Sequence, residues 1–208
     1  MLNDDLDFTR ALLATRDFGF AFVDDIFPSA SVHAILEEVR SVKMELVDND
    51  RQPIRAGKPN QVRQKYLQAP VVEGASGFEM AVRFRSAVID TMRRAAVLFP
   101  ELAGWKPRNA CYQLYRDSNE RITPHRDPAS DHQIVATATI DGQALVRMYE
   151  AIDDPNDYSS TNLRQIYEHQ ARSGSIMLLR TTGFGSGERI IHEVLPPQSR
   201  KRLVLALR

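Results

Sequence analysis

The stretch NACYQLYRDSNERITPHRDPASDHQIVATATIDGQALVRMYE, residues 109–150, carries the pattern that decides the class of fold. Its runs 110–115, 134–140 and 144–149 are rich in β-branched, aromatic and small apolar residues, which suit the pleated surface of a strand. Asp141-Gly142, between the last two runs, is a dipeptide typical of tight turns. The stretch therefore predicts short strands separated by turns.

The same pattern continues to the end of the chain. Similar runs occupy 175–179, 189–194 and 202–207, and Ser173-Gly174 and the segment GFGSG at 183–187 supply turn signals between them. Many short strands at this spacing predict a β-sandwich or a jelly roll. The polar residues 153–170 interrupt the strands as an insertion, in which we expect a loop with room for a short helix. Because long insertions often cover a functional site, this one is a candidate gate.

The first half of the sequence predicts helices that pack on this sheet. After a short strand at 18–25, a helical pattern starts at Pro28 and Ser29, and a second, longer one runs over 78–99. The apolar positions that give these patterns their helical spacing are Val32, Ile35, Leu36 and Val39 in the first and Ala81, Phe84, Val88, Met92 and Ala95 in the second. The expected class is mainly β with flanking helices (α+β).

The length of 208 residues allows one well-buried core and is short for two. We expect a single domain over 1–208, with a helical brace within 28–100 and the strand core at about 107–208. The one cysteine, Cys111, excludes an intramolecular disulfide and a thiolate zinc cluster, which favours a reducing compartment. The acidic start of the sequence has no signal pattern, and no apolar run approaches the ~20 residues of a membrane span. We expect a cytoplasmic protein without a membrane partner.

Charge argues mildly against nucleic acid as the main partner. Lys and Arg together equal Asp and Glu at 27 each, so the global positive field of a non-specific nucleic-acid binder is missing. One local exception is the segment 51–65, which contains five basic residues and no acidic one. It is either a solvated loop or a mobile lid whose charge meets an acidic or phosphorylated substrate.

His125-Arg126-Asp127 and the later His192 are the candidate metal ligands. Residues i and i+2 of extended backbone point to the same face, so the His125 imidazole and the Asp127 carboxylate can converge. Two imidazoles and one carboxylate on one face of an octahedral Fe(II) leave three positions open for chemistry. A closed four-ligand structural site would leave none. Of the other histidines, we interpret His33 and His169 as structural or solvent-facing, and His132 lies close enough in sequence to touch substrate.

A basic cluster, Arg200-Lys201-Arg202, follows His192 and leads into an apolar strand. A dicarboxylate that chelates the metal at one end needs a cation for its far carboxylate, and arginine provides a bidentate pair of charge-assisted hydrogen bonds. Arg200, Arg202 and Arg208 share strand parity, so each is a candidate for this role. The alternative is that all three are surface charges at a chain terminus.

In combination, His-x-Asp, a distant His and a following Arg resemble the signature of the Fe(II)/2-oxoglutarate dioxygenase superfamily. The resemblance covers about residues 107–208 and, more loosely, 20–39. It implies a double-stranded β-helix, which is a distorted, cupin-like jelly roll, with iron at its open end. It also implies Fe(II), 2-oxoglutarate and dioxygen as cofactor and cosubstrates, and His125, Asp127 and His192 as the iron ligands.

Two branches of the superfamily compete. Residues 109–150 resemble the AlkB branch, which implies that Gln113 and Tyr115 contact 2-oxoglutarate. Arg202 and Arg208 match the two arginines of that branch's Arg-x-Asn-x-Thr-x-Arg pattern, but Val204 and Ala206 replace its two polar residues. The sequence HEVLPPQSRKR at 192–202 instead resembles the prolyl-hydroxylase branch, as does Tyr115 ten residues before His125. The sequence leaves open both the branch and the choice between Arg200 and Arg202.

The resemblance implies hydroxylation of a C–H bond with release of succinate and carbon dioxide, and segments 51–65 and 153–170 are candidate gates. A small molecule or amino-acid-like compound is the favoured substrate, since a compact neutral chain suits a closed pocket. Oxidative demethylation of nucleic acid is the first alternative and would need a basic groove and an aromatic platform for a flipped base. Protein side-chain hydroxylation is the second. Outside the class, the same ligands could serve a zinc hydrolase, or the chain could be a non-catalytic jelly-roll binding module.

Overall fold

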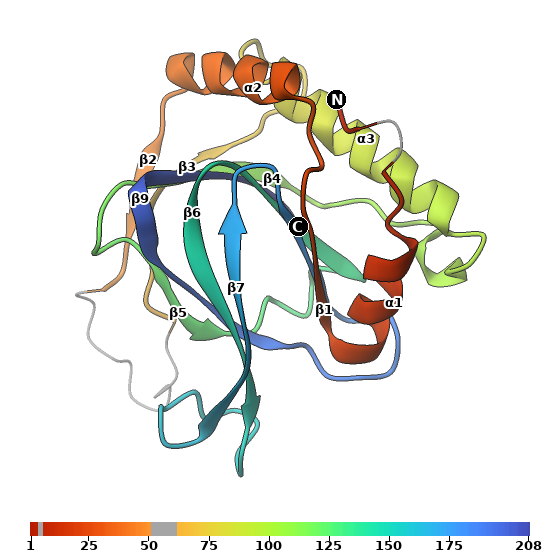
Figure 1. Cartoon of the computed structure of the whole chain (residues 1–208), viewed down its shortest axis with the longest axis vertical. Coiled ribbons are helices and arrows are strands. Elements are labelled where there is room, and N and C mark those ends of the chain that lie inside the picture. Colours follow the sequence, from red (N-terminus) through yellow and green to blue (C-terminus); the bar gives the residue numbers. More distant parts are fainter. Residues whose placement is uncertain (4–5, 51–61) are drawn as a thin grey trace.

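Two long strands, β6 (Ile134–Ala151) and β9 (Ile191–Leu207), organise the protein in the computed structural model, which describes residues 1–3, 6–50 and 62–208. They pair with each other along most of their length, and register shifts divide each into two halves. The halves belong to two different layers of β structure. In Figure 1 the long strands β6 and β9 sweep from one layer into the other, as the sides of a jelly roll do.

The larger layer follows the order β1-β8-β6-β9-β4-β3-β2, with antiparallel neighbours throughout. The smaller layer forms because β7 pairs with the second half of β6 and β5 pairs with the first half of β9. The shorter strands are β1 (Phe20–Val23), β2 (Glu45–Asp48), β3 (Lys65–Pro70), β4 (Ala110–Tyr115), β5 (Ile122–His125), β7 (Leu163–Arg172) and β8 (Ile176–Arg180).

The predicted turn at Asp141-Gly142 is wrong, because both residues lie inside the continuous strand β6. Register shifts between Thr139 and Asp141 and between Gly142 and Ala144 mark bulges there. Gly142 has φ +78, and a Cβ at this position would collide with the carbonyl oxygen of Lys201 on β9. A bulge bends and twists a strand without ending it. Residues 134–140 and 144–149, expected as two strands, are therefore one, and the same holds for 189–194 and 202–207 within β9.

The predicted helical brace is confirmed. Helices α2 (Ser29–Ser41) and α3 (Glu79–Ala95) lie across the outer face of the larger layer (Figure 1), followed by a short 3-10 turn at Pro100–Leu102. The expected stripe of α3 is buried at Ala81, Phe84, Val88 and Met92. Glu38 of α2 ties the elements together, because its carboxylate accepts hydrogen bonds from the Met80 and Ala81 amides and from the Tyr112 hydroxyl of β4.

Two local expectations need correction, and a third is not tested. Residues 9–18 form a helix, α1 (Thr9–Phe18), which the sequence analysis missed; Gly19 ends it in a left-handed conformation at φ 94, so the first strand starts at Phe20. The 153–170 insertion contains no short helix: its second part is strand β7, which leaves 152–162 as the loop. The proposed lid at 51–65 falls mostly on 51–61, which lie outside the described residues.

The interior between the layers holds the candidate site. Val135, Met177 and Leu179 from the larger layer pack against Val146 and Met148 from the smaller one in a buried cluster. Strand alternation then turns the polar residues His125, His192 and Arg202 toward the same interior. None of the described helices is long and apolar enough to cross a membrane.

Candidate metal and cosubstrate site

The three candidate metal ligands converge in the interior. His125 on β5 lies directly opposite His192 on β9, with ring centroids 4.2 Å apart, and Asp127 follows β5. The two Nε2 atoms lie 3.9 Å (His125) and 3.8 Å (His192) from the carboxylate oxygens of Asp127. One ligand atom from each residue lies within 4.8 Å of the others, and all three side chains are buried. The structure thus brings together all three residues that the sequence singled out.

The arrangement fits an iron(II) ion on its own geometry. The two Nε2-to-oxygen distances exceed hydrogen-bond length, so the three groups face one point without bonding to one another. Nδ1 of His125 lies 2.8 Å from the Thr123 carbonyl oxygen, which places the proton on Nδ1 and leaves the Nε2 lone pair free toward that point. Two imidazoles and one carboxylate are the donor set that non-haem iron sites use.

Arg202 provides a buried positive charge in the same cavity. Its side chain is 2% exposed, and burial lowers the pKa of the guanidinium below its usual value. Its Nη2 donates to the Thr139 hydroxyl at 3.1 Å, while its Nε has no hydrogen-bond partner. Among the described residues no carboxylate lies within ion-pair distance of it. Because an unpaired buried charge is costly, this position suits an anionic ligand.

No protein-family model matches the sequence, and no curated protein matches it. Solved structures do match. A prolyl-4-hydroxylase from Pseudomonas putida is 19% identical, with a TM-score of 0.62 over 95% of each chain. A Trichoplax adhaerens prolyl hydroxylase, in complex with a peptide fragment of hypoxia inducible factor, is 13% identical, with a TM-score of 0.62 over 95% of this chain and 86% of that one. SnoK, a non-heme alpha ketoglutarate dependent carbocyclase from nogalamycin biosynthesis, is 12% identical, with a TM-score of 0.63 over 100% and 85%.

The chain has the fold of the Fe(II)/2-oxoglutarate oxygenases. The expected double-stranded β-helix and the resemblance on which it rested are thereby confirmed at the level of fold. These neighbours span nearly the whole chain, including the helical brace, whereas the sequence motif covered only its second half.

In this oxygenase fold the candidate ligands are already in the protonation states that bind a metal. Burial, with a smaller contribution from the neighbouring His192, lowers the pKa of His125 to about 3. Burial likewise lowers the pKa of His192. For Asp127, burial acts to raise the pKa, but interactions with His192, Arg208 and other nearby groups together hold it below its usual value. Two neutral imidazoles beside an ionised carboxylate therefore face the site at neutral pH.

Of the remaining predicted residues, the structure places some in the lining of the cavity and others outside it. Tyr115 is the cross-strand partner of Arg202, and the Arg202 guanidinium lies 5.8 Å from the centre of the Tyr115 ring. The Tyr115 hydroxyl donates a hydrogen bond to the side-chain oxygen of Gln113 at 3.2 Å. Nη2 of Arg208 lies 3.9 Å from an Asp127 carboxylate oxygen. Arg200 and His132, by contrast, are exposed and do not line the cavity. The cavity is lined by Gln113, Tyr115, Ile122, His125, Asp127, Val135, Thr137, Met177, Leu179, His192, Val194, Arg202, Val204 and Arg208.

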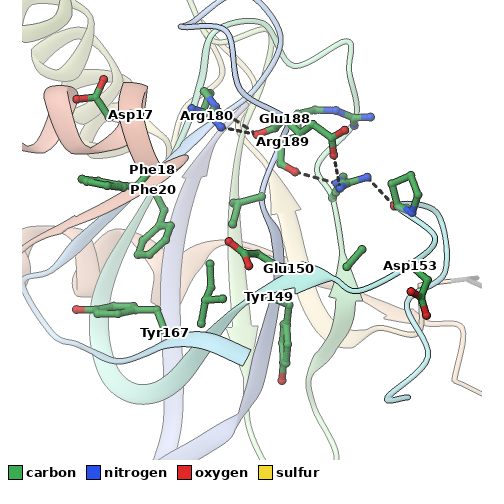
Figure 2. Close-up of a pocket in the computed structure, with 15 residues that line it drawn as sticks. Asp17, Phe18, Phe20, Tyr149, Glu150, Asp153, Tyr167, Arg180, Glu188 and Arg189 are labelled. Carbon is green, nitrogen blue, oxygen red and sulfur yellow. Dashed lines mark hydrogen bonds and ion pairs between the residues drawn. The ribbon is translucent and has the colours of Figure 1, made fainter. Parts of the chain in front are cut away.

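The cavity around Arg202 is narrow, about 20 Å³. A wider cleft of about 690 Å³ opens nearby. Figure 2 shows Phe18, Phe20 and Tyr167 on one side of this cleft, with Arg180, Glu188 and Arg189 on another. The rings of Phe20 and Tyr167 lie 5.1 Å apart. The cleft adjoins the ligand segment, because Arg189 donates a hydrogen bond to the carbonyl oxygen of Asp127.

Sequence reasoning missed three polar residues around the site. Thr139 holds the guanidinium of Arg202, and Arg126 and Arg189 contact the backbone next to the ligands. The position of Arg126 inside His-x-Asp was the only signal for it, and neither Thr139 nor Arg189 belongs to a motif.

Proposed function

We propose that the protein is an Fe(II)- and 2-oxoglutarate-dependent oxygenase that hydroxylates a C–H bond of a small-molecule or amino-acid-like substrate. The observation that carries the proposal is one cavity that contains both a converging His125, Asp127 and His192 and a buried, unpaired Arg202. A zinc hydrolase would need the three ligands, but its chemistry does not by itself require a buried arginine beside them. A non-catalytic module would need neither.

In this proposal each residue has a definite task. His125, Asp127 and His192 hold the metal, and Arg202 binds the far carboxylate of 2-oxoglutarate, with Tyr115 and Gln113 beside it. Bound iron, with 2-oxoglutarate and dioxygen, supplies oxidative decarboxylation to succinate and carbon dioxide and hydroxylation of the substrate. The apolar walls, including Val135, exclude water from the reacting groups. We also propose that residues 1–208 act as one domain.

The cleft in Figure 2 supports a small organic substrate. Its volume of about 690 Å³ lies within the range of pockets that enclose small ligands. Aromatic and aliphatic side chains, among them Phe20 and Ile190, line it together with a few charged groups. Such a lining suits a compact molecule with both apolar and polar parts. We propose that the substrate enters here.

Hydroxylation of a protein side chain is the second candidate. It is favoured by the sequence HEVLPPQSRKR at 192–202 and by the fold shared with two prolyl hydroxylases, one of which binds a peptide. Demethylation of nucleic acid has less support. The similar structures are named as a prolyl hydroxylase in complex with a peptide and as a carbocyclase of nogalamycin biosynthesis, and neither name refers to nucleic acid.

The deciding experiment measures succinate formed from 2-oxoglutarate with Fe(II) and air. We expect slow succinate formation by the wild type even without substrate, loss of it in Asp127→Ala, and no change in Asp90→Ala, which alters an exposed helix residue. Metal-dependent hydrolysis that is independent of oxygen would support the zinc alternative. Unchanged metal content in Asp127→Ala would support the binding module.

Substrate class is then tested with three panels: small organic acids and amino acids, proline-containing peptides, and methylated single-stranded oligonucleotides. Stimulated succinate formation identifies the class. Stimulation by peptides alone, or retained oligonucleotide binding with a steep salt dependence, would overturn the proposed substrate.

A further inference from the structure

The segment that precedes His192 is rich in glycine. Residues 183–187 read GFGSG, and Gly183 and Gly185 have positive φ values of 93 and 69. Glycine carries the largest conformational freedom of any residue, so this segment does not by itself determine where β9 begins. A metal ligand three residues after Arg189 nevertheless requires a well-defined position. Other contacts must therefore hold the segment.

Arginine side chains provide these contacts. Arg180, at the end of β8, donates from Nη2 to the Glu188 carbonyl oxygen at 2.7 Å, as the dashed lines in Figure 2 show. Arg126, between the ligands His125 and Asp127, donates from Nε to the Arg189 carbonyl oxygen at 2.8 Å. Two consecutive carbonyl groups ahead of His192 are thus held by buried or nearly buried guanidinium groups.

The contact between the two ligand segments runs in both directions. Arg126 donates to the backbone of Arg189, and the side chain of Arg189 donates to the backbone carbonyl of Asp127. Each ligand-bearing segment therefore provides one arginine and one carbonyl group to the other. The side chain of Arg126 is only 13% exposed, so its hydrogen bonds are shielded from water. This pair of contacts fixes how far Asp127 lies from the start of β9.

Arg126 also reaches a third segment. Its Nη1 donates to the Pro155 carbonyl oxygen at 2.7 Å, in the loop 152–162, and its Nη2 pairs with the carboxylate of Glu188 at 2.7 Å. The Glu188 side chain is 74% exposed, so this ion pair adds little. The carbonyl of Pro155 matters more, since it connects the loop beside the cleft to the ligand segment.

We propose that Arg126 and Arg189 form a reciprocal clamp that positions Asp127 and His192 for the metal and attaches the loop 152–162 to the same site. They are positioning residues and touch neither metal nor cosubstrate. The proposal rests on the proposed metal site. Groups that orient metal ligands typically change metal affinity by about 10- to 100-fold when they are removed.

The test is titration of the metal-free protein with Co(II), followed by the absorption bands of the bound ion. We expect Arg126→Gln and Arg189→Gln each to weaken Co(II) binding by about 10-fold or more and to alter the spectrum. The double variant should be weakened by less than the product of the two effects, because either substitution already opens the clamp. Arg126→Lys should give a partial effect, since one ammonium cannot reach three acceptors.

Two control variants keep the clamp intact. Glu188→Gln removes only the exposed ion pair, and Arg164→Gln removes another exposed pair, with Glu150, on the same rim. Both should bind Co(II) as the wild type does. Amide exchange adds an independent readout: the loop 152–162 should exchange faster in Arg126→Gln but not in Arg189→Gln, because only Arg126 contacts Pro155.

Equal Co(II) affinity and spectrum in the wild type, Arg126→Gln and Arg189→Gln would overturn the clamp. If Arg126→Gln does not fold, Arg126→Lys decides by the same criterion. Failure of the wild type itself to bind Co(II) would instead reject the proposed metal site, so the two proposals fail in distinguishable ways.

Discussion

The two halves of β9 hold their functional residues in different ways. Arg202, in the second half, lies between β4 and β6, each of which pairs with this part of the strand. His192, in the first half, lies between the short strand β5 and the second half of β6, and it follows a glycine-rich segment tied by arginine side chains. Both residues are thus paired with a strand on each side. At the proposed metal end, however, Asp127 lies beyond the end of β5, so this end also depends on side-chain contacts and should be the easier of the two to disturb.

Among the changes that test this comparison, the loss of a proposed metal ligand should have the largest effect. His192→Ala should weaken metal binding by at least about 100-fold, because two remaining ligands in a buried site do not complete the set. The fold should persist, since the imidazole is not part of the hydrophobic clusters. Calorimetric titration with Mn(II) and a thermal melt check both points. Wild-type affinity in this variant would show that His192 is not a ligand.

Gly142→Ala should damage the bulge that joins the two halves of β6. This glycine lies opposite Arg202, and its positive φ and the nearby Lys201 carbonyl leave no room for a Cβ. We expect a loss of about 3 kcal/mol in the free energy of unfolding, from backbone strain and the steric clash. Urea denaturation measures it. Gly74→Ala is the matched control for strain alone, since that glycine also has positive φ but nothing lies within 4 Å of its Cβ position.

Arg202→Lys should weaken the binding of 2-oxoglutarate without changing the affinity for the metal. A lysine ammonium cannot make the bidentate contact, so the KM for 2-oxoglutarate should rise by about 10- to 100-fold while Mn(II) affinity is unchanged. Arg200→Lys, on the exposed part of β9, should change neither quantity. The opposite pattern would assign the cosubstrate to Arg200.

Thr139→Val should give the smallest effect and sharpen the comparison further. It removes the hydroxyl that accepts a hydrogen bond from Arg202 but keeps the shape of the side chain. The loss of one such bond corresponds to about 1 kcal/mol, or roughly a five-fold rise in the KM for 2-oxoglutarate. Steady-state kinetics at saturating substrate would detect it. An unchanged KM would mean that the sheet alone orients the guanidinium.

Local rules account for what could be predicted. Apolar spacing revealed α2 and α3, and the i, i+2 rule for extended backbone predicted that His125 and Asp127 face one side. These patterns depend only on the period of a helix or strand. By contrast, the helix α1 and the strand β7 were missed, since the first is short and the second is largely exposed, so neither carries a strong apolar pattern.

By itself, therefore, the sequence determined the class of fold, the candidate metal ligands and the candidate arginines for a carboxylate, because residue type and strand parity are local properties. Only the tertiary structure decided which of Arg200 and Arg202, which share parity on one strand, is buried. Arg202 is enclosed between β4 and β6, whereas Arg200 lies in the exposed stretch where β9 passes from one layer to the other. The contacts of Arg126 with Arg189 and Pro155 likewise join segments far apart in the chain. Burial and long-range pairing depend on which strands meet, and no local pattern encodes that.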